Sequence, residues 1–438
     1  MKYVSTRGQA PTLPFDEVLL TGLARDGGLY LPTTWPKFSN ADLKHFSTLT
    51  YAELAIQIMT PFIGKVLSHD DVSKMVKDTY RHFQHPSVAP LKQLDQNHWL
   101  LELFHGPTLA FKDYPLQLVG RLFDYVLRKK GQKVTILGAT SGDTGSAAIE
   151  ACRDKSLIEV FMLHPAGRVS DVQRRQMTTV QSDNIHNIAL EGTFDDCQSL
   201  VKQGFLDKEL RSSINITSAN SINISRLIPQ TFYYFWAVIQ LVDNSKKVFS
   251  VPSGNFGNVA AAIIAKKMGL PIDTLIASTN SNDVVPNYLK NYQYIPKHSI
   301  QTLSNAMDVG DPSNIKRINK IYNNNPKDIW EDMHSWGFSD SETLDSIRNT
   351  YQKFNYIVDP HTAVGILGYK KYINEISKNQ IGVILSTAHP AKFKNVIEEH
   401  VDFEIPIPNQ LKEALAKDKI STKIGNSYNQ LKEFIKSI

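Results

Sequence analysis

The stretch KVTILGATSGDTGSAAIEACR, residues 133–153, decides how we interpret the fold. Its first part, KVTILGA (133–139), is a short β-branched and apolar run that predicts a buried strand. A turn of small residues follows, and the Ala-rich run SAAIEACR (146–153) predicts a helix. The segment VPSGNFGNVAAAIIAKK (251–267) repeats the order of strand, small-residue turn and helix. This repetition favours an α/β fold with parallel strands.

Other strand-length apolar runs support the same fold class. They are separated by helical patterns, and they comprise IEVFMLHP (158–165), NIHNIAL (184–190), INITSAN (214–220), KVFSVPS (247–253), TLIASTN (274–280) and IGVILST (381–387). Apolar strands that alternate with helices predict open, mostly parallel sheets covered on both faces. The segment at about 305–350 shows helices and polar loops without a strand rhythm, so we interpret it as an insertion.

The sequence divides into three parts. Residues 1–90 carry the turn signal DGGLYLP (26–32) and helical patterns at 40–46, 51–63 and 69–83, and Pro86 and Pro90 end this region. Residues 91–408 form the predicted α/β part, with a smaller subdomain at about 105–210. Residues 409–438 are a polar, partly helical tail that we expect to pack on the surface or against a partner.

Composition excludes several classes of protein. The 438 residues are 42% hydrophobic and 21% charged, which is ordinary globular usage and rules out a disordered chain. The net charge of +5 comes without a dense basic run, which argues against a nucleic-acid binder. Cys152 and Cys197 form no disulfide framework and sit in no metal spacing. No secretory leader is visible, and the apolar run at 227–242 is too short to span a membrane, so we expect a buried core helix and a cytoplasmic protein.

Two loops have the composition of anion-binding turns. GATSGDTGSAA (138–148) and SGNFGN (253–258) each follow a strand and open a helix, where unpaired N–H groups and the helix dipole favour an anion. Neither loop fits the P-loop or GxGxxG pattern, which disfavours a nucleotide-binding protein. The alternative for the first loop is an ordinary helix cap, with Asp143 or Ser141 as the capping residue.

Two further segments carry reactive or polar side chains. In HGPTLAFKDYPLQ (105–117), Lys112 lies in partly apolar surroundings, which lower the pKa of an amine and make it nucleophilic toward an aldehyde. The alternative is a surface lysine at a helix start. In STAHPAKF (386–393), Thr387 ends a predicted strand, where open α/β sheets bind ligands. The alternative there is a threonine satisfied by the backbone.

Taken in order, HGPTLAFKD, TSGDTG, SGNFGN and STAHPAKF resemble the threonine synthase family and, more broadly, the fold-type II pyridoxal phosphate enzymes. YVSTRG (3–8) and DGGLYLP (26–32) resemble the family's N-terminal domain, and the long N-terminal domain and the insertion resemble its longer, yeast-like and enterobacterial-like branch. The resemblance implies two mostly parallel α/β subdomains with an additional N-terminal domain. It also implies pyridoxal 5'-phosphate as the cofactor.

The resemblance also implies roles for single residues. Lys112 matches the lysine that holds the cofactor and then serves as general base, and Thr387 matches the position facing the pyridine nitrogen. The cofactor phosphate would lie in the loop of Gly254, Asn255, Phe256, Gly257 and Asn258. The substrate α-carboxylate would meet the loop of Thr140, Ser141, Gly142, Asp143 and Thr144, with Asp143 expected to point away and cap the helix. Arg168 and Arg226 are candidates for the substrate phosphate, and each could equally be a surface arginine.

The implied reaction converts O-phospho-L-homoserine and water to L-threonine and phosphate, by elimination at Cγ and addition of water at Cβ, as the last step of threonine biosynthesis. One alternative is a phospho-lyase that releases 2-oxobutyrate, and another is a cofactor-binding protein without catalysis. We expect no metal site, no nucleic-acid or membrane partner, and a monomer or homodimer.

Overall fold

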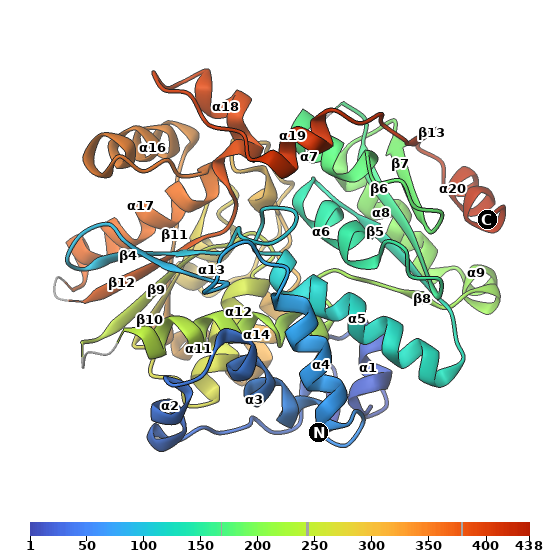
Figure 1. Cartoon of the computed structure of the whole chain (residues 1–438), viewed down its shortest axis with the longest axis horizontal. Coiled ribbons are helices and arrows are strands. Elements are labelled where there is room, and N and C mark those ends of the chain that lie inside the picture. The colour runs from blue at the N-terminus through green and yellow to red at the C-terminus, as the bar shows by residue number, and fades with distance from the viewer. Residues whose placement is uncertain (168, 242–244, 378–379) are drawn as a thin grey trace.

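The computed structural model describes residues 1–167, 169–241, 245–377 and 380–438, and it contains two sheets of mostly parallel strands (Figure 1). The larger sheet has the strand order β11-β10-β9-β12-β4-β3. Its strands are β3 (Leu91–Gln93), β4 (His98–Glu102), β9 (Lys247–Pro252), β10 (Thr274–Thr279), β11 (Met333–Gly337) and β12 (Ile381–Ser386). Only the β3–β4 pair is antiparallel.

The smaller sheet is entirely parallel, in the order β13-β7-β6-β5-β8. Its strands are β5 (Val134–Ala139), β6 (Ile158–Pro165), β7 (Ile185–Leu190), β8 (Ile216–Thr217) and β13 (Thr422–Ile424). Every residue of β5, β9 and β12 is buried, which explains why these strands appear in the sequence as continuous apolar runs. The predicted α/β class and the predicted parallel sheets are confirmed.

Helices cover both sheets. They are α5 (Asp113–Lys130), α6 (Asp143–Cys152), α7 (Asp171–Thr178), α8 (Phe194–Leu206), α9 (Lys208–Ser213), α10 (Ile224–Leu227), α11 (Gln230–Gln240), α12 (Gly257–Lys267), α13 (Val284–Asn291), α14 (Ile315–Ile321), α15 (Pro326–Asp332), α16 (Asp340–Phe354), α17 (Pro360–Glu375) and α18 (Lys394–Glu398), with 3₁₀ turns at Asn305–Met307 and Pro390–Phe393. Helix α17 packs on β9, β10 and β12, and α8 packs on β5 and β6.

The N-terminal region lies beneath the two sheets in the view of Figure 1. It consists of a two-stranded antiparallel sheet, β1 (Tyr3–Ser5) and β2 (Tyr30–Pro32), with helices α1 (Phe15–Thr21), α2 (Asn40–Phe46), α3 (Tyr51–Ile63) and α4 (His69–Tyr80). The three predicted helices are therefore present, and the last one ends three residues earlier than expected. Ser39 and Thr50 begin α2 and α3 with reciprocal capping boxes.

The N-terminal helices share one core with the rest of the chain. Buried side chains of this region join a cluster with side chains of α5, α11 and α12. Hydrogen bonds cross the same boundary: Tyr80 donates to the carbonyl of Tyr114 at 3.1 Å, and the Trp236 indole donates to the carbonyl of Ala89 at 3.0 Å. Since the first of these contacts is buried and the second is partly buried, we expect the N-terminal region to hold the α5 side of the molecule in place.

The segment at 305–350 differs from the sequence prediction. It contains strand β11, which pairs in parallel with β10 at the edge of the larger sheet, so the expected absence of a strand is wrong. The run MHSWG (333–337) lacks the β-branched residues that marked the other strands, and the short α15 ends immediately before it. Strand β4 also escaped prediction, and β8 covers only two residues of the expected run 214–220.

The C-terminal tail packs on the smaller sheet. It contains α19 (Asn409–Leu415), strand β13 and α20 (Tyr428–Lys436). Strand β13 extends the sheet beside β7, and the buried Leu431 and Ile435 of α20 pack with residues of α8. The tail is therefore not only helical, because one short edge strand adds to the sheet. Of the two expected alternatives, packing on the surface of the chain or against a partner, the structure shows the first.

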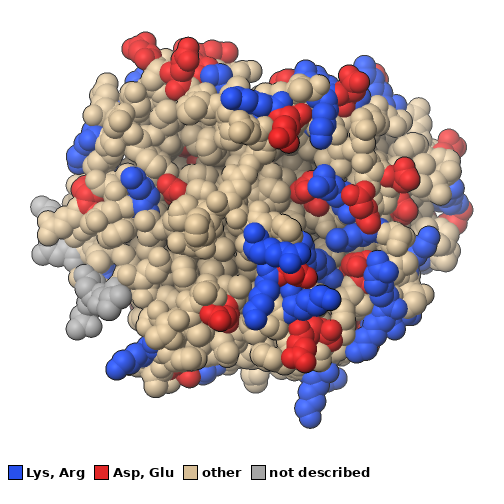
Figure 2. All heavy atoms as spheres, viewed as in Figure 1, with Lys and Arg blue, Asp and Glu red and all other residues tan. Residues whose placement is uncertain are grey.

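The apolar run at 227–242 forms the buried helix α11 through most of its length, as predicted. Among the described residues, no helix has the length and apolar character needed to cross a membrane. On the face shown in Figure 2, basic and acidic side chains are interspersed rather than segregated. This distribution agrees with the mild net charge of the sequence.

Candidate active site

A pocket lies between the two sheets, where strands of both end at their carboxyl edges. Residues directly after β5, β9 and β12 line it, together with the start of α5 and the start of α12. Open α/β sheets bind ligands at such edges. The described residues predicted from the sequence all line this pocket except Gly142, namely Lys112, Thr140, Ser141, Asp143, Thr144, Arg226, Gly254, Asn255, Phe256, Gly257, Asn258 and Thr387.

The loop that carries Lys112 is held by its neighbour Asp113. The Asp113 carboxylate accepts hydrogen bonds from the backbone N–H of Thr108 at 2.8 Å and from its hydroxyl at 2.7 Å. Leu109 has a positive φ of 60°, and a Cβ at Gly106 would lie 2.5 Å from the Cβ of Asp113. The loop therefore folds tightly back on α5, which fixes Lys112 at the N-cap of that helix.

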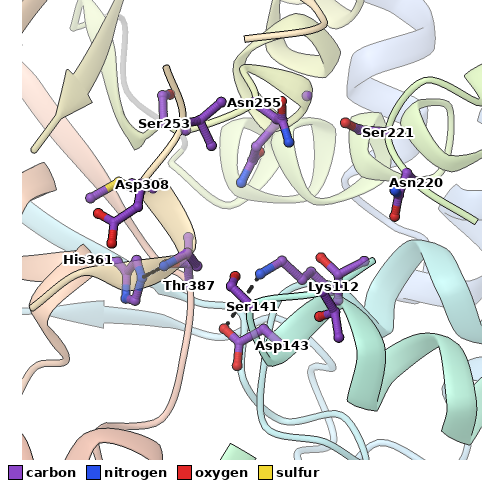
Figure 3. Close-up of a pocket in the computed structure, with 18 of the residues that line it drawn as sticks. Lys112, Ser141, Asp143, Asn220, Ser221, Ser253, Asn255, Asp308, His361 and Thr387 are labelled. Atoms are coloured by element: carbon purple, nitrogen blue, oxygen red, sulfur yellow. Dashed lines mark hydrogen bonds and ion pairs between the residues drawn. The ribbon is translucent and has the colours of Figure 1, made fainter. Parts of the chain in front are cut away.

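Lys112 is buried, and its amine faces the carboxylate of Asp143 across 3.5 Å (Figure 3). Burial lowers the pKa of Lys112 to about 8; the charge of Asp143 opposes this effect, and the charges of Arg226 and Lys392 add to it. An amine with such a pKa is neutral in about a tenth of the molecules at pH 7, far more often than an ordinary lysine. The predicted apolar environment of Lys112 is thus present, and the alternative of an exposed surface lysine is wrong.

The expectation that Asp143 points away and caps α6 is wrong. Gly142 occupies the N-cap, and no side chain caps this helix. The Asp143 carboxylate instead lies 2.7 Å from the amine of Lys392 and accepts a hydrogen bond of 2.9 Å from the amide of Gln173. Burial alone would raise the pKa of Asp143, but the charges of Lys392 and Lys112 outweigh burial and hold it well below the ordinary value. Two buried amines thus attract the carboxylate more strongly than the helix end does.

The remaining residues of the first loop are fixed by the loop itself. The Thr140 hydroxyl oxygen accepts hydrogen bonds from the N–H groups of Gly142 and Gly145, at 2.9 and 2.8 Å. Gly142 has a φ of 139°, and a Cβ there would lie 2.6 Å from the side chain of Gln173. Ser141 and Thr144 line the pocket. The loop therefore presents hydroxyl groups to the pocket while its backbone keeps a conformation that favours glycine.

The second loop forms a cradle at the start of α12. Phe256 adopts a left-handed conformation with φ of 58°, and the helix begins at the next residue, Gly257. A Cβ at Gly254 would lie 2.7 Å from the Cα of Met307, and one at Gly257 would lie 2.9 Å from the Cβ of Ser221. Asn258 is held by hydrogen bonds of 2.6 and 2.7 Å from the hydroxyls of Tyr233 and Tyr234. The free N–H groups of the first helical turn suit an anion.

Arg226 brings a buried cation to the same pocket. Its guanidinium donates to the carbonyl of Ala219 at 2.9 Å, and its Nε has no hydrogen-bond partner among the described residues. The amide nitrogen of Asn258 is likewise buried without a partner in that part of the chain. Burial lowers the pKa of Arg226 to about 10, so the group stays charged at neutral pH. Two residues with unpartnered donors line one pocket, which suits an anionic ligand. Arg168, the other predicted cation, lies outside the described residues.

Comparison with known proteins assigns the family. Residues 2–80 match the family described as threonine synthase N terminus, residues 84–387 match pyridoxal-phosphate dependent enzymes, and residues 362–435 match threonine synthase, C-terminal. The chain belongs to the threonine synthase family. The threonine synthase of Pseudomonas aeruginosa is 42% identical over 461 residues, covering 99% of this chain and 98% of that protein. That of Saccharomyces cerevisiae is 41% identical, covering 90% of this chain and 88% of the relative.

Solved structures of threonine synthases agree with this assignment. The pyridoxal phosphate-bound threonine synthase from Brucella melitensis has a TM-score of 0.94 and 39% identity, covering 100% of this chain and 99% of that one. The threonine synthase from Escherichia coli has a TM-score of 0.91 and 34% identity over the full length of both chains. The fold-type II architecture and the pyridoxal phosphate cofactor predicted from the sequence are therefore confirmed.

Several residues of this pocket were not predicted from the sequence, and two of them, His361 and Asp308, are titratable. The imidazole of His361 accepts a hydrogen bond of 3.1 Å from the N–H of Ala306, and its other nitrogen lies 2.9 Å from the carboxylate of Asp359 (Figure 3). Asp308 also lines the pocket, where burial raises its pKa to about 6. The sequence signal for His361 was weak: an Asp-Pro pair at 359–360 opens α17, and His361 follows it.

Thr387 lies at the end of β12, across the pocket from Lys112 (Figure 3). Its backbone carbonyl accepts a hydrogen bond of 2.8 Å from the N–H of Phe111, which joins the Lys112 loop to the larger sheet.

Among the described residues, no group of three or more His, Cys, Asp or Glu side chains could hold a metal ion.

Proposed function

We propose that this chain converts O-phospho-L-homoserine and water to L-threonine and phosphate. The observation that carries the proposal is the placement of the buried Lys112 amine in the same pocket as the glycine cradle of α12 and the cation Arg226. A base whose pKa lies well below that of an ordinary lysine and two separate anion-binding features are what a phosphorylated amino acid and a phosphorylated cofactor require.

The residues present fit the cofactor. The loop Gly254–Asn258 leaves no room for a side chain at its glycines and ends in free N–H groups, so we propose that it holds the cofactor phosphate. Lys112 would hold the aldehyde end, and the Thr387 hydroxyl would face the ring nitrogen. When bound, pyridoxal phosphate supplies an electron sink for negative charge that develops on the substrate carbons.

The substrate would lie between the first loop and the cradle. The N–H and hydroxyl groups of the loop Thr140–Thr144 would receive the α-carboxylate, with the charge of Asp143 balanced by its two lysine neighbours. Arg226, which lines the pocket and has an unpartnered donor, would bind the substrate phosphate. The contribution of Arg168 stays a prediction.

Lys112 would carry the proton transfers. Its neutral amine would take the proton from Cα of the substrate and pass it on within the pocket; neutral again, it would take a proton from Cβ, while the Cγ–O bond breaks and the phosphate leaves with the bonding electron pair. Protons would then return to Cα and Cγ as the hydroxyl group of water adds at Cβ. Release of phosphate before water adds at Cβ requires that the intermediate stays in the pocket, which the burial of Lys112 and Thr387 favours because it excludes solvent.

The experiment that tests this role is the variant Lys112→Ala. We expect it to fold and to form threonine at least 10³-fold more slowly, since it lacks the general base. Lys74→Ala, which removes an exposed lysine of α4, is the matched control and should keep full activity. Near-normal threonine formation by Lys112→Ala would contradict the proposal.

The division of the chain at residues 90 and 408, the smaller subdomain at about 105–210, a cytoplasmic location and a monomeric or dimeric state also remain proposals. The shared core of the N-terminal region and α5 supports folding of the two parts as one unit.

A further inference from the structure

Lys392 is a buried cation that the reaction itself does not require. It follows β12 in the 3₁₀ turn Pro390–Phe393, and only 1% of its surface is exposed. Its amine lies 2.7 Å from the carboxylate of Asp143 and donates to the carbonyl of Thr108 at 2.9 Å. Burying an ammonium group is costly unless it is paired, so a lysine at this place indicates a specific partner.

Asp143 is the group that Lys392 and Lys112 share. One carboxylate oxygen is close to Lys392, and the other faces Lys112 at 3.5 Å. Gln173, which is fully buried, donates to the oxygen on the Lys392 side and so fixes the orientation of the carboxylate. The three charged side chains come from three segments far apart in the sequence, the start of α5, the start of α6 and the turn after β12.

This arrangement places a carboxylate where an anionic substrate is expected. Without Lys392, no second cation would pair with the Asp143 carboxylate, and its negative charge would act undiminished on Lys112 and on the substrate. A carboxylate paired only with Lys112 would favour the ammonium form of that amine, which cannot act as a base. It would also repel an incoming α-carboxylate.

We propose that Lys392 is a positioning residue that draws the Asp143 carboxylate away from Lys112 and neutralises it, so that Lys112 loses its proton easily and an anionic substrate can approach the loop at 140–144. This inference deepens the proposed function and rests on it. Lys392 also holds the carbonyl of Thr108, but it acts on Lys112 through Asp143 and touches none of the reacting atoms.

Other charges around Lys112 do not replace Lys392. Arg226 of α10 acts on Lys112 with the same sign as Lys392 but forms no ion pair with Asp143 among the described contacts. The Asp113 carboxylate of α5 accepts two hydrogen bonds from Thr108, and the imidazole of His361 in α17 is hydrogen-bonded to the Asp359 carboxylate. Lys392 is therefore the cation closest to Asp143 in the described part of the chain.

The test measures Lys112 directly, without turnover. The full-length chain is freed of cofactor and labelled with a small amount of N-acetoxysuccinimide at a series of pH values. Peptide mass spectrometry then gives the acetylation of Lys112 relative to the exposed Lys74. Only a neutral amine reacts, so the midpoint of the pH curve reports the protonation of Lys112. We expect the wild-type midpoint near pH 8.

Lys392→Met is expected to raise this midpoint by about one pH unit, since the loss of one nearby cation leaves Asp143 to pair with Lys112 alone. Lys392→Gln, which is neutral but keeps a hydrogen-bond donor, should shift the midpoint in the same direction. Lys392→Arg keeps the charge and should leave the midpoint unchanged. In the cofactor-loaded enzyme, Lys392→Met should shift the acid limb of the pH profile of kcat to higher pH.

A folded Lys392→Met or Lys392→Gln variant with an unchanged or lowered midpoint would overturn the proposal. Failure of both neutral variants to fold would assign Lys392 a purely structural role and would overturn it too. Because acetylation of the cofactor-free chain needs no substrate, these outcomes are independent of whether the chain makes threonine.

Discussion

The amine of Lys112 lies 3.5 Å from a carboxylate oxygen of Asp143, and both buried side chains line one pocket. At this distance in a poorly solvated site, the carboxylate favours the charged form of the amine and partly offsets the effect of burial. Asp143 therefore shifts Lys112 toward its ammonium form, against the larger effect of burial.

The substitution Asp143→Asn should lower the pKa of Lys112 below about 8, because burial would then act without an opposing negative charge. The amine is neutral above its pKa, so the pH curve of Lys112 acetylation in the cofactor-free chain should move toward lower pH. We expect a shift of about one unit. Asp124→Asn, which changes a carboxylate on α5 outside the pocket, is the control and should leave the midpoint in place. An upward shift in Asp143→Asn would contradict this account.

Gly257→Ala should weaken cofactor binding. Gly257 is the first residue of α12, and a Cβ added there would lie 2.9 Å from the Cβ of Ser221. The cradle must therefore shift. We expect at least a tenfold increase in the Kd for pyridoxal phosphate, measured by absorbance titration. Gly131→Ala is the control: its Cβ meets nothing within 4 Å, and its positive φ of 61° should lower stability by about 1 kcal/mol without changing the cofactor Kd. Equal Kd values for the two variants would show that the cradle does not hold the cofactor.

Arg226→Met should impair use of the phosphorylated substrate. The guanidinium is buried, its Nε has no partner among the described residues, and it lines the pocket. Removal of a charge-assisted contact to phosphate should lower kcat/KM by about 100-fold or more and weaken inhibition by inorganic phosphate. Arg128→Met, at an exposed position on α5, should leave both quantities unchanged. Unaltered phosphate inhibition in folded Arg226→Met would place the substrate phosphate elsewhere.

Leu431→Ala should destabilise the chain without changing the chemistry. Leu431 of α20 is fully buried against α8, where loss of a leucine side chain costs about 2–5 kcal/mol in the free energy of unfolding. Leu206→Ala is a matched control, since that side chain is 78% exposed, and it should change the free energy by less than about 0.5 kcal/mol. Denaturant unfolding measures both values. A stable Leu431→Ala variant would mean that the C-terminal tail adds little to the fold.

The fold was predictable where a strand is buried on both faces and its sequence is therefore a continuous apolar run. Strands β5, β9 and β12 are buried along their whole length and so appear as apolar runs. Strand β11 was missed because MHSWG resembles a loop, and only its pairing with β10 makes it a strand. Strand β13 was missed for the same reason, since its exposed residues pair with β7 at the edge of the smaller sheet. Edge strands depend on a neighbour that local patterns do not contain.

The site was predictable where chemistry depends on a contiguous motif. Lys112 and the loop Gly254–Asn258 lie in such motifs, and the structure brings them to one pocket. Asp143 was misjudged because its place at a helix start suggested a cap, whereas its partner Lys392 lies 249 positions away in the sequence. Lys392 lies in the motif STAHPAKF (386–393), but its neighbours in the sequence do not distinguish it from an exposed lysine. Its burial and its ion pair appear only in three dimensions.

The most direct test of the central claim is a product assay. The purified, cofactor-loaded chain is incubated with O-phospho-L-homoserine, and phosphate, threonine and 2-oxobutyrate are measured together. We predict equal amounts of phosphate and threonine with little 2-oxobutyrate. Phosphate with 2-oxobutyrate in place of threonine, or no phosphate at all, would contradict the account.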